Sequence, residues 1–214
     1  MTHLKRHKVP KTWPIPRKGT TFVVRTNFDM NSGIPVLIIL RDVLKIVNNR
    51  KESKKAINQK NILLNNNPIK DEKTAMTLFD VLTIVPMKKN YQLIIAENKK
   101  FDVVECKDAK EKISKIINKK VLKGKKVQLN LYDGRNFISD IKCKVNDSVV
   151  IDLMNGKISD CLALKEKSNV LVISGKHAGK NGVIDEILEK RKMARIISGK
   201  EKINVLIKQL MVVK

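Results

Sequence analysis

Cationic side chains surround three glycines in the run from Val170 to Ile187, which reads V-L-V-I-S-G-K-H-A-G-K-N-G-V-I-D-E-I. The glycines are Gly175, Gly179 and Gly182, and the residues Lys176, His177 and Lys180 lie between them. Glycine permits positive φ and a close approach of backbones, so a turn built on it presents neighbouring cations with little steric bulk around them. Such cations suit contact with the phosphates of a nucleic-acid backbone. The first candidate chemistry is therefore phosphate binding.

A nucleotide-binding Walker loop is a second interpretation of the same run, and its spacing fits poorly. That loop needs four residues between its two glycines, followed by Lys and then Ser or Thr. Here three residues separate Gly175 from Gly179, and Asn181 stands where the magnesium-binding hydroxyl belongs. The β-branched apolar residues on both sides predict two strands, not a strand and a helix. A plain hairpin with solvated lysines is the other alternative.

The glycine spacing and the flanking strands together resemble the KOW motif. This motif occurs in ribosomal proteins and in transcription elongation factors that bind RNA or polymerase. The resemblance implies that the loop contacts RNA or a polymerase, and it identifies a module more specifically than a whole protein.

The chain as a whole carries a large excess of positive charge. Its 214 residues include 45 Lys and Arg against 21 Asp and Glu, a formal net charge of +24. Such a charge repels itself within a folded domain and calls for an anionic partner. Because the cations are spread along the whole sequence, and not along one amphipathic helix, nucleic acid is favoured over a membrane. No run of about 18 apolar residues and no signal region is present, so we expect a cytoplasmic protein.

Residue types that carry catalysis or metal binding are not arranged for either. Cys106, Cys143 and Cys161 are widely spaced and form no C-x-x-C pair, which predicts reduced, mostly buried thiols. The histidines form no cluster with carboxylates or cysteines, and no paired carboxylates or nucleophile–base–acid order is present. We therefore expect no catalytic residue, no metal, no cofactor and no small-molecule substrate.

Residues 1–35 predict an extended basic arm. Prolines at positions 10, 14 and 16 oppose helix and sheet hydrogen bonding, which favours a polyproline-like conformation. Such a segment cannot bury enough apolar surface to order itself alone. We expect it to order on RNA, with a solubilising tail as the alternative. Trp13 either stacks on a base or docks against its own domain, and the second is favoured.

Residues 36–98 predict a small α/β module. Pro35 is expected to open an apolar helix, and the polar positions of that helix, Arg41, Lys45 and Asn48 or Asn49, would share one face. Ser53 is expected to cap a second short helix that ends near Gln59. That cap would place Lys54 and Lys55 in the first turn of the helix. A short strand and an asparagine turn follow. This order of elements resembles the alpha-L RNA-binding fold, which also occurs in bacterial ribosomal proteins, pseudouridine synthases and tyrosyl-tRNA synthetases.

The second half of the chain predicts β structure. Residues from about 99 to 165 indicate a compact antiparallel β domain, with hairpin turns at Asp133–Gly134 and Asn155–Gly156. A short basic helical segment is expected to begin at Asp108 and to run into the Lys- and Ile-rich stretch up to Lys126. Residues 166–214 suit a five-stranded SH3-like barrel.

Five stretches covering nearly the full length resemble the four-e family of archaeal and eukaryotic small-subunit ribosomal proteins. They are H-L-K-R at 3–6, P-K-T-W-P-I-P-R-K-G-T at 10–20, P-V-L-I-I-L-R-D-V-L-K at 35–45, K-V-Q-L-N-L-Y-D-G-R-N at 126–136 and I-S-G-K-H-A-G-K-N-G at 173–182. The resemblance implies a structural, non-catalytic role in the small (30S) subunit, with 16S rRNA and neighbouring ribosomal proteins as partners. A KOW-bearing transcription elongation factor, which would match only the final barrel, is the alternative.

These inferences combine into one expected architecture. The fold class is α+β, mostly β, with an extended basic N-terminal arm (1–35), a small alpha-L RNA-binding α/β module (36–98), an antiparallel β central domain (99–165) and a C-terminal SH3-like KOW barrel (166–214). The cations expected to bind RNA are Lys5, Arg6, Lys8, Lys11, Arg17, Lys18, Arg41, Lys45, Lys54, Lys55, Lys125, Arg135, Lys176 and Lys180, together with His177.

Overall fold

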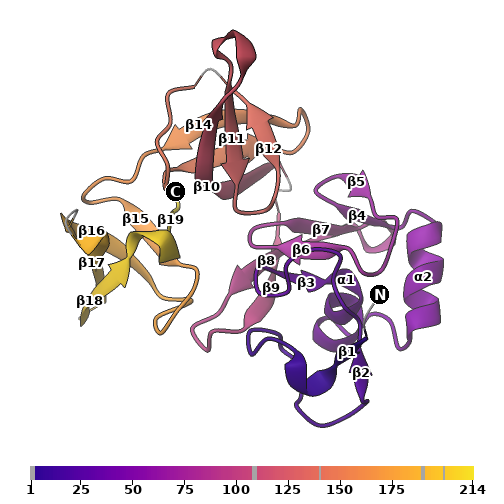
Figure 1. Cartoon of the computed structure of the whole chain (residues 1–214). Helices are drawn as coiled ribbons and strands as arrows, with labels where there is room; N and C mark the ends of the chain where they lie inside the picture. Colours follow the sequence, from indigo (N-terminus) through magenta and orange to yellow (C-terminus); the bar gives the residue numbers. More distant parts are fainter. Residues whose placement is uncertain (1–2, 108–109, 140, 189–190, 200) are drawn as a thin grey trace. The chain divides into compact units, whose positions relative to one another are not determined.

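The computed structural model of the chain describes residues 3–107, 110–139, 141–188, 191–199 and 201–214 (Figure 1). They form two compact units. One contains the described residues of Met1–Ile94 and Lys100–Lys110, and the other those of Ile95–Lys99 and Glu111–Lys214. Both units consist mainly of antiparallel strands with short helices, which confirms the mostly-β prediction. No helix in the described part of the chain is long and apolar enough to cross a membrane.

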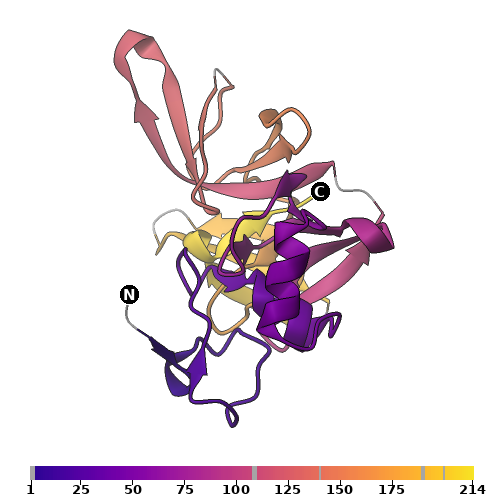
Figure 2. The same cartoon turned by 90° about the vertical axis from the view of Figure 1, so that its right-hand side faces the viewer.

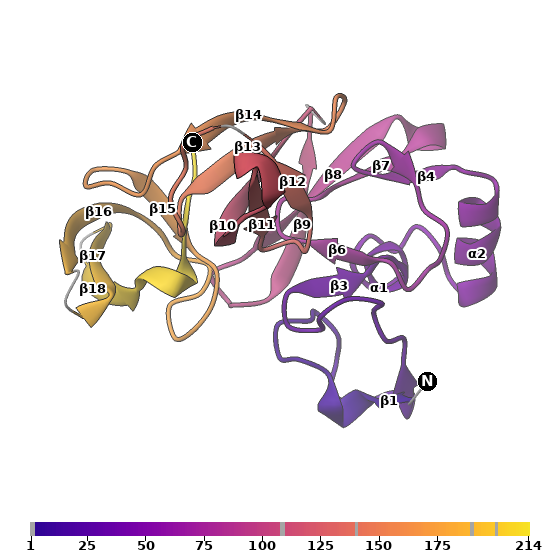
Figure 3. The same cartoon turned by 45° about the horizontal axis from the view of Figure 1, so that its top comes forward.

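The first unit is built from short strands and two short helical segments. Its elements are β1 (Leu4–Lys5), a 3₁₀ turn (Arg6–Lys8), β2 (Phe22–Val23), β3 (Gly33–Pro35), α1 (Val36–Ile38) continued by a π-helical turn (Ile39–Val43), α2 (Arg50–Asn58), β4 (Ile62–Leu64), β5 (Asn67–Pro68), β6 (Ala75–Thr77), β7 (Val81–Ile84), a 3₁₀ turn (Val85–Met87), β8 (Lys89–Ile95) and β9 (Phe101–Cys106). The main sheet has the order β5-β4-β7-β8-β9, and β3 pairs with β6. Helix α2 lies at the outside of the unit, beyond β4 (Figures 1 and 3).

The N-terminal segment folds back on its unit and is not simply extended. Strand β1 pairs with β2, and the Trp13 side chain is only 2% exposed. Its indole Nε1 donates to the carbonyl oxygens of Met30 (3.1 Å) and Gly33 (3.2 Å), while the Phe101 N–H donates to the Thr12 carbonyl (2.7 Å). The prediction of an extended arm is wrong here, because burial of the indole supplies the apolar area that the prolines do not. The docking interpretation of Trp13 is confirmed.

The first predicted helix is much shorter than expected. After α1 the chain makes the π-helical turn Ile39–Val43, and Lys45 then takes a left-handed φ of 53°. This reversal turns the Ile46 N–H back toward the Leu40 carbonyl, which it reaches at 2.9 Å. Because the helix has ended, Arg41 and Lys45 do not share one helical face, and that part of the prediction is wrong.

Helix α2 begins four residues earlier than expected. The Asn49 side chain caps it by accepting a hydrogen bond from the Glu52 N–H at 3.0 Å. An asparagine followed three residues later by glutamate is the pattern of a capping box. Ser53 is therefore a buried residue inside the helix and not its cap. Lys54 lies in the middle of the helix and Lys55 in its last turn, away from the N-terminus.

The second unit contains two five-stranded antiparallel sheets. Its elements are β10 (Glu111–Val121), a turn (Lys123–Lys125), β11 (Val127–Leu131), β12 (Asn136–Ile138), β13 (Ser148–Asp152), β14 (Lys157–Leu162), β15 (Asn169–Val172), β16 (Asn181–Leu188), β17 (Met193–Ser198), β18 (Glu201–Leu206), a 3₁₀ helix (Ile207–Gln209) and β19 (Leu210–Val212). The sheet orders are β12-β11-β10-β13-β14 and β18-β17-β16-β15-β19. The five strands predicted for the end of the chain and the two hairpin turns are confirmed.

Strand β10 occupies the stretch where a helical segment was expected. It is the central strand of its sheet and pairs with both β11 and β13. Ile116 lies opposite Leu131 and joins a core with Leu129 and Val149. The helix prediction is wrong because β-branched isoleucines between lysines fit a sheet whose buried lysines find polar partners. Asp108, where that helix was expected to begin, lies outside the described residues.

The two sheets of this unit are joined through the Lys115 side chain, which is 3% exposed. Its Nζ donates to the carbonyl oxygens of Ile207 (2.7 Å), Lys208 (3.1 Å) and Leu210 (2.7 Å). The three acceptors match the three donors of an ammonium group. Lys115 thus fixes the 3₁₀ turn before β19 to strand β10.

We expect the contribution of Lys115 to stability to depend on pH. Burial lowers the pKa of Lys115 from 10.5 to about 8. Between these values the unfolded chain binds more protons than the folded chain, so the stability contribution rises with pH across this window. The unfolding free energy of the wild type, minus that of Lys115→Met, should therefore increase from pH 8 to 10.5 in urea titrations. A difference that stays flat would show that the amine titrates at its usual pKa.

Candidate nucleic-acid interface

The loop between β15 and β16 holds its cations in two different ways. The Lys176 side chain is exposed, and His177 is half-buried. Lys180 is half-buried and pairs with Glu201, with 2.7 Å between its Nζ and the carboxylate Oε2. The hydrogen bond from Lys180 holds the pKa of the Glu201 carboxyl below its usual value. Lys176 is therefore the cation of this loop that is most available to an outside phosphate.

The loop glycines serve the packing of the protein itself. Gly175 and Gly179 have φ values of 91° and 87°, as the motif predicts. A Cβ added to Gly179 would lie 2.1 Å from the Ala96 carbonyl oxygen, and one added to Gly182 would lie 2.5 Å from the Ile197 carbonyl oxygen. The close backbone approach expected here is thus made to neighbouring turns and strands of the same unit. Glycine fixes the position of the loop, and the lysines remain the candidate ligands.

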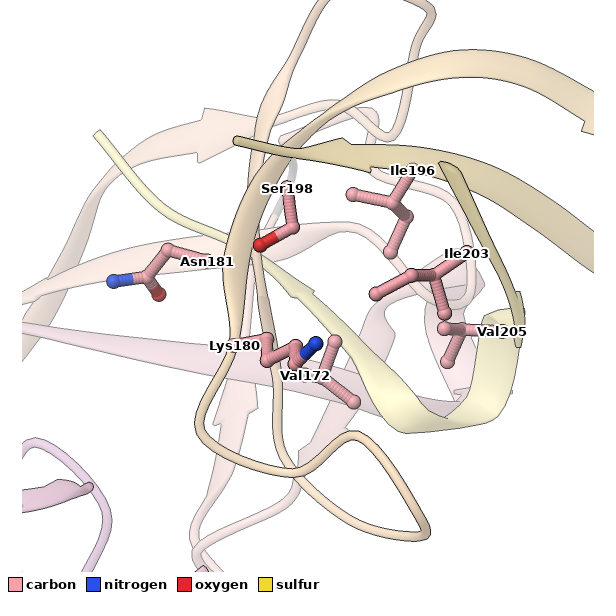
Figure 4. Close-up of a pocket in the computed structure, with 7 residues that line it drawn as sticks. All are labelled: Val172, Lys180, Asn181, Ile196, Ser198, Ile203 and Val205. Atoms are coloured by element: carbon pink, nitrogen blue, oxygen red, sulfur yellow. The ribbon is translucent and has the colours of Figure 1, made fainter. Parts of the chain in front are cut away.

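A shallow hollow lies beside this loop, over β16, β17 and β18 (Figure 4). It encloses about 170 Å³ that includes open solvent, and Val172, Ile196, Ile203 and Val205 form its apolar wall. Because that figure includes open solvent, the enclosed space is smaller still, whereas sites for small molecules are commonly about 300 Å³ or larger. The hollow therefore offers no support for a small-molecule site.

Most predicted cations of the N-terminal segment are exposed: Lys5, Lys8, Lys11, Arg17 and Lys18. Arg6 differs, because its guanidinium is engaged within the segment. Its Nε donates to the Thr20 carbonyl (2.8 Å) and its Nη1 to the Pro16 carbonyl (2.9 Å). A Cβ on Gly19 would lie 3.1 Å from the Arg6 Cζ. The structure assigns Arg6 a clear part in closing this loop, and its contact with RNA stays a prediction.

The two predicted cations that follow α1, Arg41 and Lys45, differ in their exposure to solvent. Arg41 is half-buried and pairs with Asp42, with 2.8 Å between Nη2 and Oδ2. Lys45 is exposed on the left-handed turn that ends the π-helical segment. Lys45, and not Arg41, is therefore the cation of this turn that is exposed to solvent.

The exposed surface of α2 carries Lys54 and Lys55. The Lys54 Nζ lies 3.9 Å from the Glu72 carboxylate, which also accepts a hydrogen bond from Arg50 Nε at 2.9 Å. Burial opposes ionisation of Glu72, but the hydrogen bonds donated by Arg50 and the positive charge of Arg50 favour it, so the pKa of Glu72 lies below its usual value. Glu72 therefore stays charged and anchors the N-terminal end of the helix.

The last two predicted cations, Lys125 and Arg135, lie in turns of the sheet β12-β11-β10-β13-β14. Arg135 lies in the turn between β11 and β12, with its Nε 3.8 Å from the Asp133 carboxylate. That carboxylate also pairs with the buried Lys112. The side chain of Lys125 lies outside the described residues.

Sequence reasoning missed a group of cations on the β10–β11 hairpin. We call them the hairpin lysines: Lys119, Lys120, Lys123 and Lys126. All four are exposed, and the far end of the hairpin projects beyond the other strands of its sheet (Figure 2). The signal in the sequence is the run N-K-K-V-L-K-G-K-K at 118–126, which the helix prediction assigned to the wrong element.

The thiols are less buried than the expectation of mostly buried cysteines. All three cysteines are unbridged, Cys143 is buried, and Cys106 and Cys161 are half-buried. Burial and a hydrogen bond with Cys143 raise the pKa of the Cys161 thiol to about 12. A thiol with so high a pKa is a poor nucleophile.

Both units therefore present exposed cations with few neighbouring anions. Within the described residues, no three His, Cys, Asp or Glu side chains gather as ligands of a metal ion would. The arrangement can bind and neutralise a polyphosphate chain, and the conformations of its loops are set by internal hydrogen bonds.

Known proteins and protein families match this chain along most of its length. Family models match in three places: the RS4NT domain over residues 2–28, ribosomal family S4e over residues 87–158 and the KOW motif over residues 166–198. The chain is 37% identical to the small ribosomal subunit protein eS4 of Methanocella arvoryzae over 188 residues, which cover 86% of this chain and 80% of the relative. It is 33% identical to the Haloarcula marismortui protein of the same name, covering 97% and 88%.

A solved structure has a similar fold. The crystal structure of the 30S ribosomal protein S4e from Thermoplasma acidophilum superposes with a TM-score of 0.74 at 21% identity, covering 85% of this chain and 95% of that one.

Proposed function

The chain belongs to the ribosomal protein S4e family, whose members are structural constituents of the small ribosomal subunit and not enzymes, and we propose that it binds 16S rRNA through its exposed cations. The family resemblance expected from the sequence is confirmed. A KOW transcription elongation factor is excluded, because the relatives match across both units and not only over the terminal sheet. The finer proposals are the RNA-binding residues themselves and contacts with neighbouring ribosomal proteins.

The observation that carries the proposal is a net charge of +24 held mainly on exposed side chains with few paired anions. Exposed lysines neutralise phosphates and release the counterions condensed on RNA. Duplex RNA hides its base edges in a deep, narrow major groove, so recognition would follow shape and backbone more than base sequence. We further propose that α1, α2 and β4 act as an alpha-L-like surface, and that β15–β19 form the SH3-like barrel that carries the KOW loop.

Lys176 gives the sharpest test of the loop. We expect Lys176→Ala to weaken binding to 16S rRNA broadly and to reduce the log–log salt slope by about one unit, since one phosphate contact is lost. Filter binding of the full chain across a salt series measures both quantities.

Glu201→Gln provides a matched variant with the opposite expectation. It releases Lys180 from the 2.7 Å ion pair, so affinity should rise. If both variants bind with the affinity and slope of the wild type, the KOW loop does not contact RNA.

A further inference from the structure

One face of the three neighbouring strands β10, β11 and β12 carries a cluster of side-chain amides. Leu129 and Leu131 point into the core, so alternation along β11 places Gln128 and Asn130 on the opposite face. The register extends this face across the neighbouring strands, because Asn118 and Asn136 both lie opposite Asn130. We call this surface the amide face, and its members are Asn118, Lys120, Gln128, Asn130, Asn136 and Ile138.

The amide face is open to solvent and ordered in rows. One row runs Asn118–Asn130–Asn136, and the next holds Gln128 with Lys120 and Ile138 on either side. Paired strands lie about 4.8 Å apart, so each row spaces its side chains at that interval. Asn118, Lys120 and Asn136 are exposed, and Gln128 and Asn130 are half-buried.

Packing does not account for this composition. Asparagine is depleted in strands, and a cross-strand row of three contributes less to the sheet than β-branched residues would. Gln128 Nε2 donates to Asn130 Oδ1 at 2.8 Å, and Asn118 Oδ1 accepts from the Lys119 N–H at 2.7 Å. These bonds orient the amides, and each amide group still has donors and acceptors in excess of them.

Three of the hairpin lysines lie toward the turn of the same ribbon, whereas Lys119 lies opposite Leu129 and its Nζ donates to the Cys143 carbonyl at 3.2 Å. Lys120 is itself a member of the amide face, while Lys123 lies in the turn and Lys126 directly before β11. Gly124 in that turn has open space around its Cβ position. A ligand on the amide face therefore meets positive charge at one end, which favours a nucleic acid over a neutral protein surface.

We propose that the amide face binds the minor groove of double-stranded RNA, with amides on ribose 2′-hydroxyls and with Lys120, Lys123 and Lys126 on the flanking phosphates. An amide donates and accepts, as a 2′-hydroxyl does, and the minor groove of A-form RNA is wide and shallow enough for a nearly flat sheet face. The 2′-hydroxyl is also the group that distinguishes RNA from DNA at such a site. This inference rests on the proposed RNA-binding function and names the element and the RNA feature that it recognises.

The test compares the full chain with two triple variants on three ligands. The ligands are 16S rRNA, a short RNA duplex and a DNA duplex of matching sequence. Asn118→Ala/Asn130→Ala/Asn136→Ala should lose about tenfold in affinity for the RNA duplex while keeping its DNA affinity and its salt slope, because no charge is removed. Lys120→Gln/Lys123→Gln/Lys126→Gln should weaken binding to both duplexes and lower the slope by about two to three units.

A measurement on the wild-type chain alone covers the case in which a variant fails to fold. Methylation of the 2′-hydroxyls of the RNA duplex should reduce wild-type affinity by about the same tenfold. If methylation and the asparagine substitutions leave RNA duplex affinity unchanged while 16S rRNA still binds, this inference is wrong and the proposed function stands. If the triple asparagine variant keeps its RNA affinity but small subunits assembled with it lack a neighbouring ribosomal protein, the amide face contacts protein and this inference is wrong. If the wild type does not bind 16S rRNA, the proposed function itself fails.

Discussion

Gly179→Ala is expected to destabilise the second unit by on the order of 4 kcal/mol. The new Cβ would lie 2.1 Å from the Ala96 carbonyl oxygen and 2.6 Å from its carbonyl carbon. Both are backbone atoms that no rotamer change can move, so the loop or the turn at Ala96 must shift. The φ of 87° adds left-handed strain, and losses of this size occur when strain and overpacking combine. Urea unfolding followed by circular dichroism measures the loss.

Gly124→Ala is the matched control. Gly124 has a similar φ of 77°, and nothing lies within 4 Å of its Cβ position. Only the left-handed penalty applies there, about 1 to 2 kcal/mol. If the two variants lose equal stability, the contact between the KOW loop and Ala96 has no energetic role.

Asp133→Ala is expected to cost about 3 to 5 kcal/mol, because it removes the carboxylate partner of a buried ammonium group. The Lys112 Nζ lies 2.6 Å from Asp133 Oδ2, and the two side chains are 1% and 3% exposed. The double variant Lys112→Met/Asp133→Leu should recover much of that loss, since an apolar pair of similar volume leaves no charge in the core. Thermal and urea unfolding of the three proteins gives the comparison.

The exposed pair of Glu111 and Lys214 serves as the control for the buried one. Both side chains are more than half exposed, so Glu111→Ala should cost no more than about 1 kcal/mol. A loss for Asp133→Ala as small as that for Glu111→Ala would contradict the role assigned to the buried pair.

Local turn chemistry was the part of the fold that could be predicted from sequence. Turns form where residues tolerate a left-handed backbone, and residue type alone shows which residues do so. This is why the hairpins at Asp133–Gly134 and Asn155–Gly156 and the strands around the KOW glycines could be predicted. The left-handed Asn65 and Asn66 belong to the same class.

Elements decided by tertiary contacts could not be predicted in the same way. The lysines of β10 suggested a basic helical segment, but Lys112 and Lys115 are buried because Asp133 and three distant carbonyl oxygens accept hydrogen bonds from them. The helix that begins with α1 ends early because the chain reverses at Lys45. No glycine or asparagine at that position indicates the reversal in the sequence. Trp13 was correctly expected to dock, although its acceptors at Met30 and Gly33 were not foreseen.

The candidate site also has a part that could be predicted from local residue type and a part that depends on tertiary contacts. Exposed cations of the N-terminal segment and the KOW loop follow from residue type and from the glycine turn. The amide face does not, because it exists only once the register brings Asn118 and Asn136 beside Asn130. Periodicity within one strand cannot show which strands lie beside it.

Sedimentation with small ribosomal subunits tests the central claim most directly. The full chain is mixed with subunits and run through sucrose gradients at low and high salt, and the bound fraction is crosslinked to 16S rRNA. We predict that the protein sediments with the subunit at low salt, is released as salt rises, and crosslinks to 16S rRNA. A protein that stays at the top of the low-salt gradient, and whose behaviour ribonuclease does not alter, would contradict the account.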